Sequence, residues 1–214
     1  KFGYSASQVG PLTRSELNAW LGGAPSTPGT PSTPTPTGAG LSVWLASDNP
    51  AAGSVVDASA LKEMMKLVFV NGDNAEVKVT GLKLKRIGVS ADASVTNAYL
   101  FKGADRLTDG SAVSTTIVNF NNSAGLFMVP AGGSVTISVL ADIDGSASET
   151  VGFQVVSASD VTSNASSTKG TYPISGNLMT VATATIAGVN FNTTTTPAAA
   201  TIDPQDGYTV FQNS

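Results

Sequence analysis

The sequence predicts an all-β protein whose main domain, residues 41–187, is an immunoglobulin-like β-sandwich. Hydrophobic and polar residues alternate in short runs, and turn-forming sequences rich in Gly, Asn, Asp and Pro separate those runs. Many short strands at this spacing are typical of such a sandwich, and a jelly roll is the alternative. The predicted strands are 41–45, 66–70, 77–80, 82–85, 97–102, 115–120, 125–129, 134–141, 151–157 and 178–186.

One of these runs contains a break in its alternation. The hydrophobic phase shifts by one residue at Gly81, which predicts a β-bulge or a bend. Lys78, Lys83 and Lys85 alternate with Val and Leu on either side of it, so we expect the three lysines on one outward face. They form either a solvated surface that discourages edge pairing or a basic strip that meets an acidic partner.

Residues 1–22 contain a predicted helix. Thr13 and Glu16 form a capping box at its start, and Gly22 and Gly23 end it. One face is apolar, with Leu17, Trp20 and Leu21. Because two turns of helix are not stable alone, this segment must pack on the rest of the chain or on a neighbour.

Two further segments flank the predicted sandwich. Residues 23–40 hold five prolines and five threonines, which predicts an extended linker and suits O-linked glycans. Residues 188–214 form a second linker and a predicted terminal strand at 207–212. That strand adds either to an edge of its own sandwich or to a neighbouring subunit.

The composition excludes several kinds of chemistry. The 214 residues include 25 Ser and 25 Thr but no Cys and no His, which rules out disulfides, thiolate nucleophiles and imidazole bases. The net charge of −4 argues against a nucleic-acid partner. No apolar run reaches the roughly 20 residues of a membrane-spanning helix. No pair of carboxylates stands out for hydrolysis, so we expect no enzymatic activity.

A calcium site is the candidate metal site, and we expect no other cofactor. Asp142, Asp144 and Glu149 lie in one short stretch with Gly145, and carboxylates spaced in this way can bind Ca²⁺ in a loop between strands. The alternative is ordinary turn chemistry, in which Asp and Gly favour the turn itself.

Other motifs have simpler explanations. Ser59 with Lys62, and Ser166 with Lys169, match S-x-x-K, but the companion motifs of acyl-transfer enzymes are absent. Glycosylation sequons begin at Asn121, Asn164 and Asn192. We expect Trp44 to anchor the sandwich core.

Two stretches resemble known families. The pattern G-P-x-T-R-x-x-L-N at residues 10–18 resembles the end of a small three-helix peptidoglycan-binding module. Residues 41–53, 77–88, 99–109 and 129–133 resemble the repeated β-domains of surface-layer-like proteins from ultrasmall, candidate-phylum bacteria.

The resemblance implies a secreted structural protein of the cell surface. Such a surface-layer subunit, or fragment of one, would self-assemble with other copies of itself and contact peptidoglycan or another envelope polysaccharide. The alternatives are an adhesin or cell-wall polysaccharide-binding module, and a pilus-like fibre subunit that exchanges strands.

Overall fold

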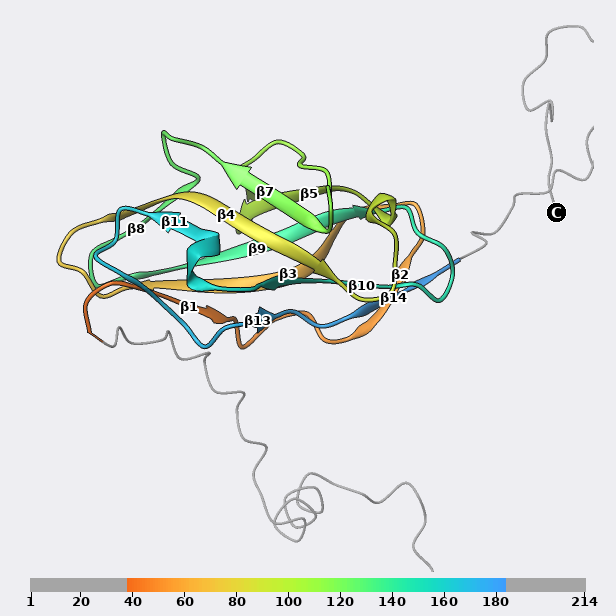
Figure 1. Ribbon diagram of the computed structural model, residues 1–214, viewed down its shortest axis with the longest axis horizontal. Coiled ribbons are helices and arrows are strands. Elements are labelled where there is room, and N and C mark those ends of the chain that lie inside the picture. Colours follow the sequence, from red (N-terminus) through yellow and green to blue (C-terminus); the bar gives the residue numbers. More distant parts are fainter. Residues whose placement is uncertain (1–37, 184–214) are drawn as a thin grey trace, which may run out of the picture.

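The computed structural model describes residues 38–183, which form two β-sheets packed face to face (Figure 1). The predicted helix within residues 1–22, most of the linker 23–40 and the terminal strand 207–212 lie outside the described residues.

The first sheet is built around one long strand, β3, which pairs with β1 on one side and with β9 on the other. Its six strands follow the order β12 (Thr168–Lys169), β1 (Leu41–Leu45), β3 (Ser59–Asn71), β9 (Ser134–Ile143), β5 (Val95–Lys102) and β6 (Asp105–Arg106).

The second sheet is built around β4. The main path runs β11 (Val161–Ser163), β4 (Val77–Ile87), β10 (Thr150–Val155), β14 (Met179–Ala182) and β2 (Gly53–Val56). Three more strands join it: β7 (Ile117–Asn121) and β8 (Phe127–Val129) pair with β4, and β13 (Ile174–Ser175) pairs with β10. Two short 3₁₀ helices, η1 (Asp92–Ser94) and η2 (Ala158–Asp160), lie in the connections.

The inner faces of the two sheets form one hydrophobic core. Phe69 of β3 meets Phe127 of β8 edge to face, with ring centroids 4.9 Å apart, which joins the two sheets directly. Alternate residues of β9 and β4 complete the core, including the fully buried Ile137 and Leu84. The predicted immunoglobulin-like β-sandwich is therefore confirmed.

The irregularity at Gly81 is confirmed as well. The predicted strands 77–80 and 82–85 form one continuous strand, β4, whose pairing with β11 shifts register beside Gly81. Lys78, Lys83 and Lys85 point outward from β4, while Val79, Leu82 and Leu84 between them are buried. An extra residue in one strand of a pair is the ordinary origin of such a shift.

Buried polar side chains fix the loop that follows β3. Asn71 is fully buried, and its amide donates to the carbonyls of Ala75 and Val129 at 2.8 and 3.1 Å. Its Oδ1 accepts the backbone N–H of Asp73 at 2.8 Å. These bonds satisfy backbone groups that would otherwise be buried unpaired.

Asp73 in turn holds the start of the sandwich. Its carboxylate accepts the backbone N–H groups of Gly40 and Ser166 at 2.8 and 2.9 Å, and the Ser166 hydroxyl at 2.7 Å. The Ser166 N–H contributes most to lowering the pKa of Asp73 below its ordinary value. Gly40 has φ of +101°, and a Cβ there would collide with Ser167, so the linker must enter β1 through a glycine.

The prediction for Trp44 is wrong. Trp44 lies on the outer face of β1, half-buried beside Val68 and Val70, whereas its neighbour Val43 enters the core. Side chains alternate across a strand, and the core of this sheet takes Leu41 and Val43, so Trp44 must point outward.

Truncating the inter-sheet aromatic contact tests this account of the core. We expect Phe69→Ala in the full chain to lower the free energy of unfolding by about 3–5 kcal/mol, because it removes a fully buried ring and leaves a cavity. Urea denaturation followed by tryptophan fluorescence measures the change. The control is Val89→Ala at a residue 81% exposed, which should leave the midpoint nearly unchanged.

Candidate functional site

The edge of the second sheet formed by β7 presents two amide side chains. Val118 and Phe120 of β7 are buried in the core, and the alternation places Asn119 and Asn121 on the solvent side. Among the described residues, neither amide group has a hydrogen-bond partner. Both are therefore available to a ligand.

A tight turn before β7 sets the position of these amides. Thr115 and Thr116 both adopt left-handed backbone conformations, with φ of 52° and 65°, which are costly for residues other than glycine. The backbone N–H of Thr116 donates to Asp92 Oδ2 at 3.0 Å, and the Arg86 N–H donates to the Thr116 carbonyl at 2.7 Å. These bonds hold the turn in place.

A buried arginine orients that aspartate. Arg86 is 8% exposed, and its Nε and Nη2 donate to Asp92 Oδ1 at 3.1 and 3.0 Å while Nη1 donates to the Ser90 hydroxyl at 2.7 Å. The Thr116 N–H, and then the Arg86 guanidinium, hold the pKa of Asp92 below its ordinary value. The network connects β4, η1 and the start of β7.

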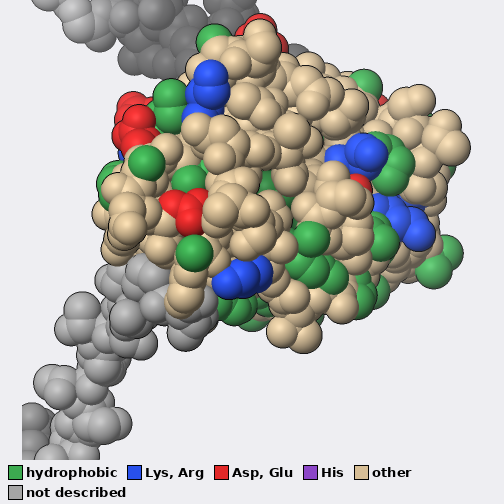
Figure 2. Space-filling model, turned by 60° about the vertical axis from the view of Figure 1, so that its left-hand side comes forward, with side chains coloured by type: hydrophobic (Ala, Val, Ile, Leu, Met, Phe, Trp, Pro, Cys, Tyr) green, Lys and Arg blue, Asp and Glu red, His purple; other side chains and the backbone are tan. Residues whose placement is uncertain are grey.

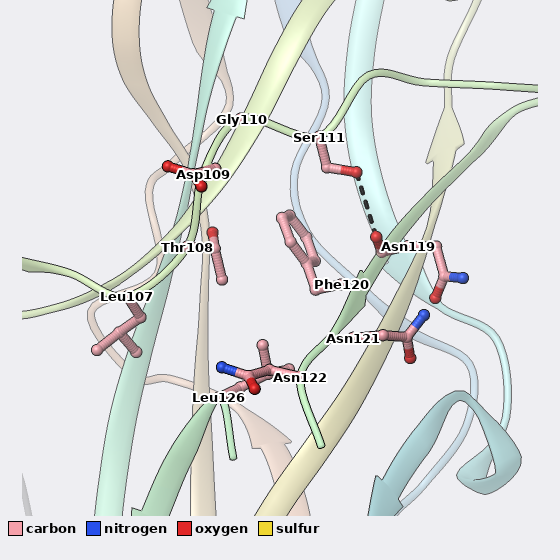
Figure 3. A pocket seen from close by; sticks show the side chains of 10 residues that line it. All are labelled: Leu107, Thr108, Asp109, Gly110, Ser111, Asn119, Phe120, Asn121, Asn122 and Leu126. Atoms are coloured by element: carbon pink, nitrogen blue, oxygen red, sulfur yellow. Dashed lines mark hydrogen bonds between the residues drawn. The ribbon is translucent and has the colours of Figure 1, made fainter. Parts of the chain in front are cut away.

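A hollow of about 370 Å³ lies on one side of β7 (Figure 3). Apolar side chains of Leu107, Phe120 and Leu126 line part of it, and the remainder is polar, with Thr108, Asp109, Ser111 and Asn122. Figure 3 shows the hydroxyl of Ser111 bonded to the backbone of Asn119, at 3.2 Å, beside Phe120.

A second hollow, of about 170 Å³, shares Asn119 and Asn121 with the first. Its other walls include Lys83, Asp160 and Thr162, and Gly81 lies beneath it. A Cβ at Gly81 would come within 3.0 Å of Asn121 Oδ1 and 3.1 Å of Thr162, so the glycine leaves this space open. Asn119 and Asn121 thus stand between two polar hollows.

The structure does not gather the three carboxylates proposed for calcium. Asp142 accepts bonds from the Tyr99 hydroxyl at 2.6 Å and the Leu61 N–H at 2.9 Å. Glu149 accepts bonds from Ser94 and from the backbone of Ser146. Within residues 38–183, no group of three or more acidic side chains is placed to hold a metal ion. Calcium binding by Asp142, Asp144 and Glu149 therefore stays a prediction.

The lysines on the outward face of β4 do not form a continuous basic strip. Lys83 lies 3.9 Å from the carboxylate of Asp160, and Lys78 donates to the Ser123 carbonyl at 3.4 Å. Figure 2 shows one face of the molecule, on which charged side chains are scattered among uncharged groups. Binding of an acidic partner to this face remains a prediction.

In the described structure, the serines of the S-x-x-K pairs do not bond to their lysines, and the sequon asparagines differ in their surroundings. The Ser166 hydroxyl donates to Asp73, and Ser59 Oγ is buried without a partner in the described residues, so neither serine bonds to its lysine. Asn164 accepts the backbone N–H of Lys78 at 2.7 Å, whereas Asn121 is exposed. Asn192 lies outside the described residues.

Local sequence patterns do not single out the amide pair on β7. Asn119 and Asn121 do alternate with the apolar Val118 and Phe120. The hollows beside them arise from packing between distant segments, which no local pattern encodes.

Comparisons with known proteins leave the chain without a family. No protein-family model matches it, and no curated protein is significantly similar to it. A solved structure with some likeness is the seventh ScaB type I cohesin from Pseudobacteroides cellulosolvens. The two are 10% identical over 71% of this chain and 98% of the cohesin chain, with a TM-score of 0.27, a similarity that carries no inference about function. Within residues 38–183, no helix has the length and hydrophobicity needed to span a membrane.

The Asp92 network predicts a pH-dependent contribution to stability. Since the pKa of Asp92 is lowered in the folded state, its stabilising effect is present above the ordinary carboxyl pKa and is lost as the pH falls through the folded value. We expect Asp92→Asn to lower the urea midpoint at pH 7, and the difference from wild type to shrink toward pH 3.

Asp144→Asn is the matched control, because the exposed Asp144 side chain accepts no hydrogen bond within the described structure. The urea midpoint of Asp144→Asn should equal that of the wild type at both pH values. A difference for Asp92→Asn that is equal at pH 7 and pH 3 would contradict a role for the charge.

Proposed function

We propose that the protein is a non-enzymatic structural component of a bacterial cell surface, a surface-layer subunit or a fragment of one, which assembles outside the cell with other copies of itself. Residues 1–22, which resemble the end of a peptidoglycan-binding module, attach it to the envelope. The observation that carries the proposal is the unprotected edge of the second sheet at β2.

β2 is the last strand on its side of the sheet. Within residues 38–183 its one strand partner is β14, with which it pairs in parallel, and the two strands lie side by side in Figure 1. The backbone N–H of Asp57 donates to the Ala182 carbonyl at 2.9 Å. Because alternate residues of a strand face opposite sides, the N–H and C=O groups of Ser54 and Val56 point away from β14. These groups are ready to pair with another strand.

This edge lacks the usual protection against pairing. Natural edge strands carry lysines, prolines or bulges that prevent association. Residues 53–56 read Gly-Ser-Val-Val, with no charge and no proline, and Val56 is 42% exposed. Leu178, which precedes β14, is exposed to the same extent. Uncharged groups of this kind favour the addition of a strand.

The strand proposed to add to this edge is 207–212 of a neighbouring copy. Its sequence, Gly-Tyr-Thr-Val-Phe-Gln, alternates as a strand does, and it also carries no charge. The segment lies outside the described residues. Between residues 170 and 202 the chain has no charged side chain, and Asp203 and Asp206 are the charges nearest to the proposed strand. Repeated addition from copy to copy gives an assembly.

A proline at the outward-facing N–H of β2 tests the proposal. We expect Ser54→Pro to abolish assembly while the melting temperature stays within a few degrees of wild type, because that N–H makes no bond within the sheet. Ser54→Thr is the matched control and should assemble normally. Sedimentation velocity over a range of protein concentrations, in calcium and in EDTA, measures the oligomeric state.

Deleting residues 207–212 tests whether the terminal strand is the segment that pairs with β2. Loss of assembly in the deletion variant and in Ser54→Pro supports addition of the terminal strand to a neighbour. Assembly that survives both changes would contradict the β2 contact. A wild-type chain that stays monomeric at high concentration would overturn self-assembly and would leave the strand on its own sandwich.

A further inference from the structure

We propose that the amides of Asn119 and Asn121, with the hollows on either side of β7, form a binding site for a neutral carbohydrate. This inference does not depend on self-assembly. It concerns the edge of the second sheet opposite to β2, since β7 and β2 lie on opposite sides of β4 and β14.

The two amides offer the hydrogen bonding that sugar hydroxyls require. Each Asn side chain supplies two donors and one acceptor, and a hydroxyl group both donates and accepts. Residues two apart on a strand lie on the same face about 6.6 Å from each other, so Asn119 and Asn121 can contact neighbouring parts of one ligand. Both amides are exposed and lack partners in the described structure.

The walls of the hollows add further polar groups. Thr108, Ser111 and Asn122 line the larger hollow, and Thr162 lines the smaller one. A volume of about 370 Å³ falls within the range of small-molecule sites. Leu107, which is half-buried, offers apolar surface that can contact the C–H groups of a sugar ring (Figure 3).

The charges around the site argue against an ionic ligand. Lys83 is the basic residue among those that line the two hollows, and it already lies 3.9 Å from Asp160. The second oxygen of Asp160 accepts the backbone N–H groups of Val156 and Ser157 at 3.1 and 2.9 Å. A phosphate or nucleic acid would find one cation, already paired with a carboxylate, and a metal ion would find no carboxylate cluster.

The geometry also argues against a protein helix or an apolar peptide as ligand. Phe120 and Leu126 are only 3% and 6% exposed, so no apolar anchor pocket is open to a large side chain. Apart from Asp109 in the larger hollow and the Lys83–Asp160 pair in the smaller one, the surface displays uncharged amides and hydroxyls. A polyhydroxylated, uncharged ligand matches that chemistry.

The experiment is a binding titration with the full chain produced without glycosylation, which keeps Asn121 free. The probes are soluble tetrasaccharides of N-acetylglucosamine, of β-linked glucose and of α-linked glucose. Calorimetry measures the binding of each probe. We expect saturable binding of at least one probe. The double variant Asn119→Ala/Asn121→Ala should weaken that binding about tenfold or more, because several hydrogen bonds are lost together.

Asn74→Ala is the matched control, since Asn74 is an exposed asparagine in the loop between β3 and β4. It should bind like wild type. Sedimentation of the double variant should also match wild type, so that a loss of binding reports on β7 and not on assembly. Absence of saturable binding to all three probes, or equal affinity in the double variant, would overturn the proposal.

Discussion

The packing of two sheet faces against each other is the constraint on which the rest of the structure depends. A chain without cysteine has no disulfide to hold it, so its stability comes from burying one face of each sheet. Phe69 and Phe127 meet across the two layers, and Ile137 and Leu84 pack in the same core. Most inward positions on the strands take part in this contact, which leaves outward positions and sheet edges for function.

Polar side chains at strand ends and in the connections fix the position of the neighbouring strands. Asn71 and Asp73 fix the entry to β1, while Arg86 and Asp92 hold the turn that leads into β7. Asn71, Asp73 and Asp92 bond to backbone groups, and Arg86 bonds to the side chains of Asp92 and Ser90, so we expect a change in one of them to shift a strand and the side chains that the strand presents. The position of the amide pair is in this way set by residues that do not touch a ligand.

The second sheet has two edges of different chemistry. β2 exposes backbone groups between uncharged side chains, which suits pairing with another strand, whereas β7 exposes amides beside polar hollows, which suits a sugar. The two edges are separated by the strands between them. A copy bound to a neighbour through β2 would therefore still present β7 to the cell envelope or to a glycan.

The sequence by itself determined the fold class, the bulge at Gly81 and the outward face of Lys78, Lys83 and Lys85, because alternation and turn residues are local signals. It did not reveal β2, which is short and pairs in parallel with the distant β14, and it misplaced Trp44, whose direction depends on which face of β1 the core takes. The carboxylates of Asp142 and Glu149, neighbours in sequence, turn to separate partners in the fold. Edges, hollows and side-chain partners depend on contacts between residues far apart in the chain, so only the tertiary structure decides them.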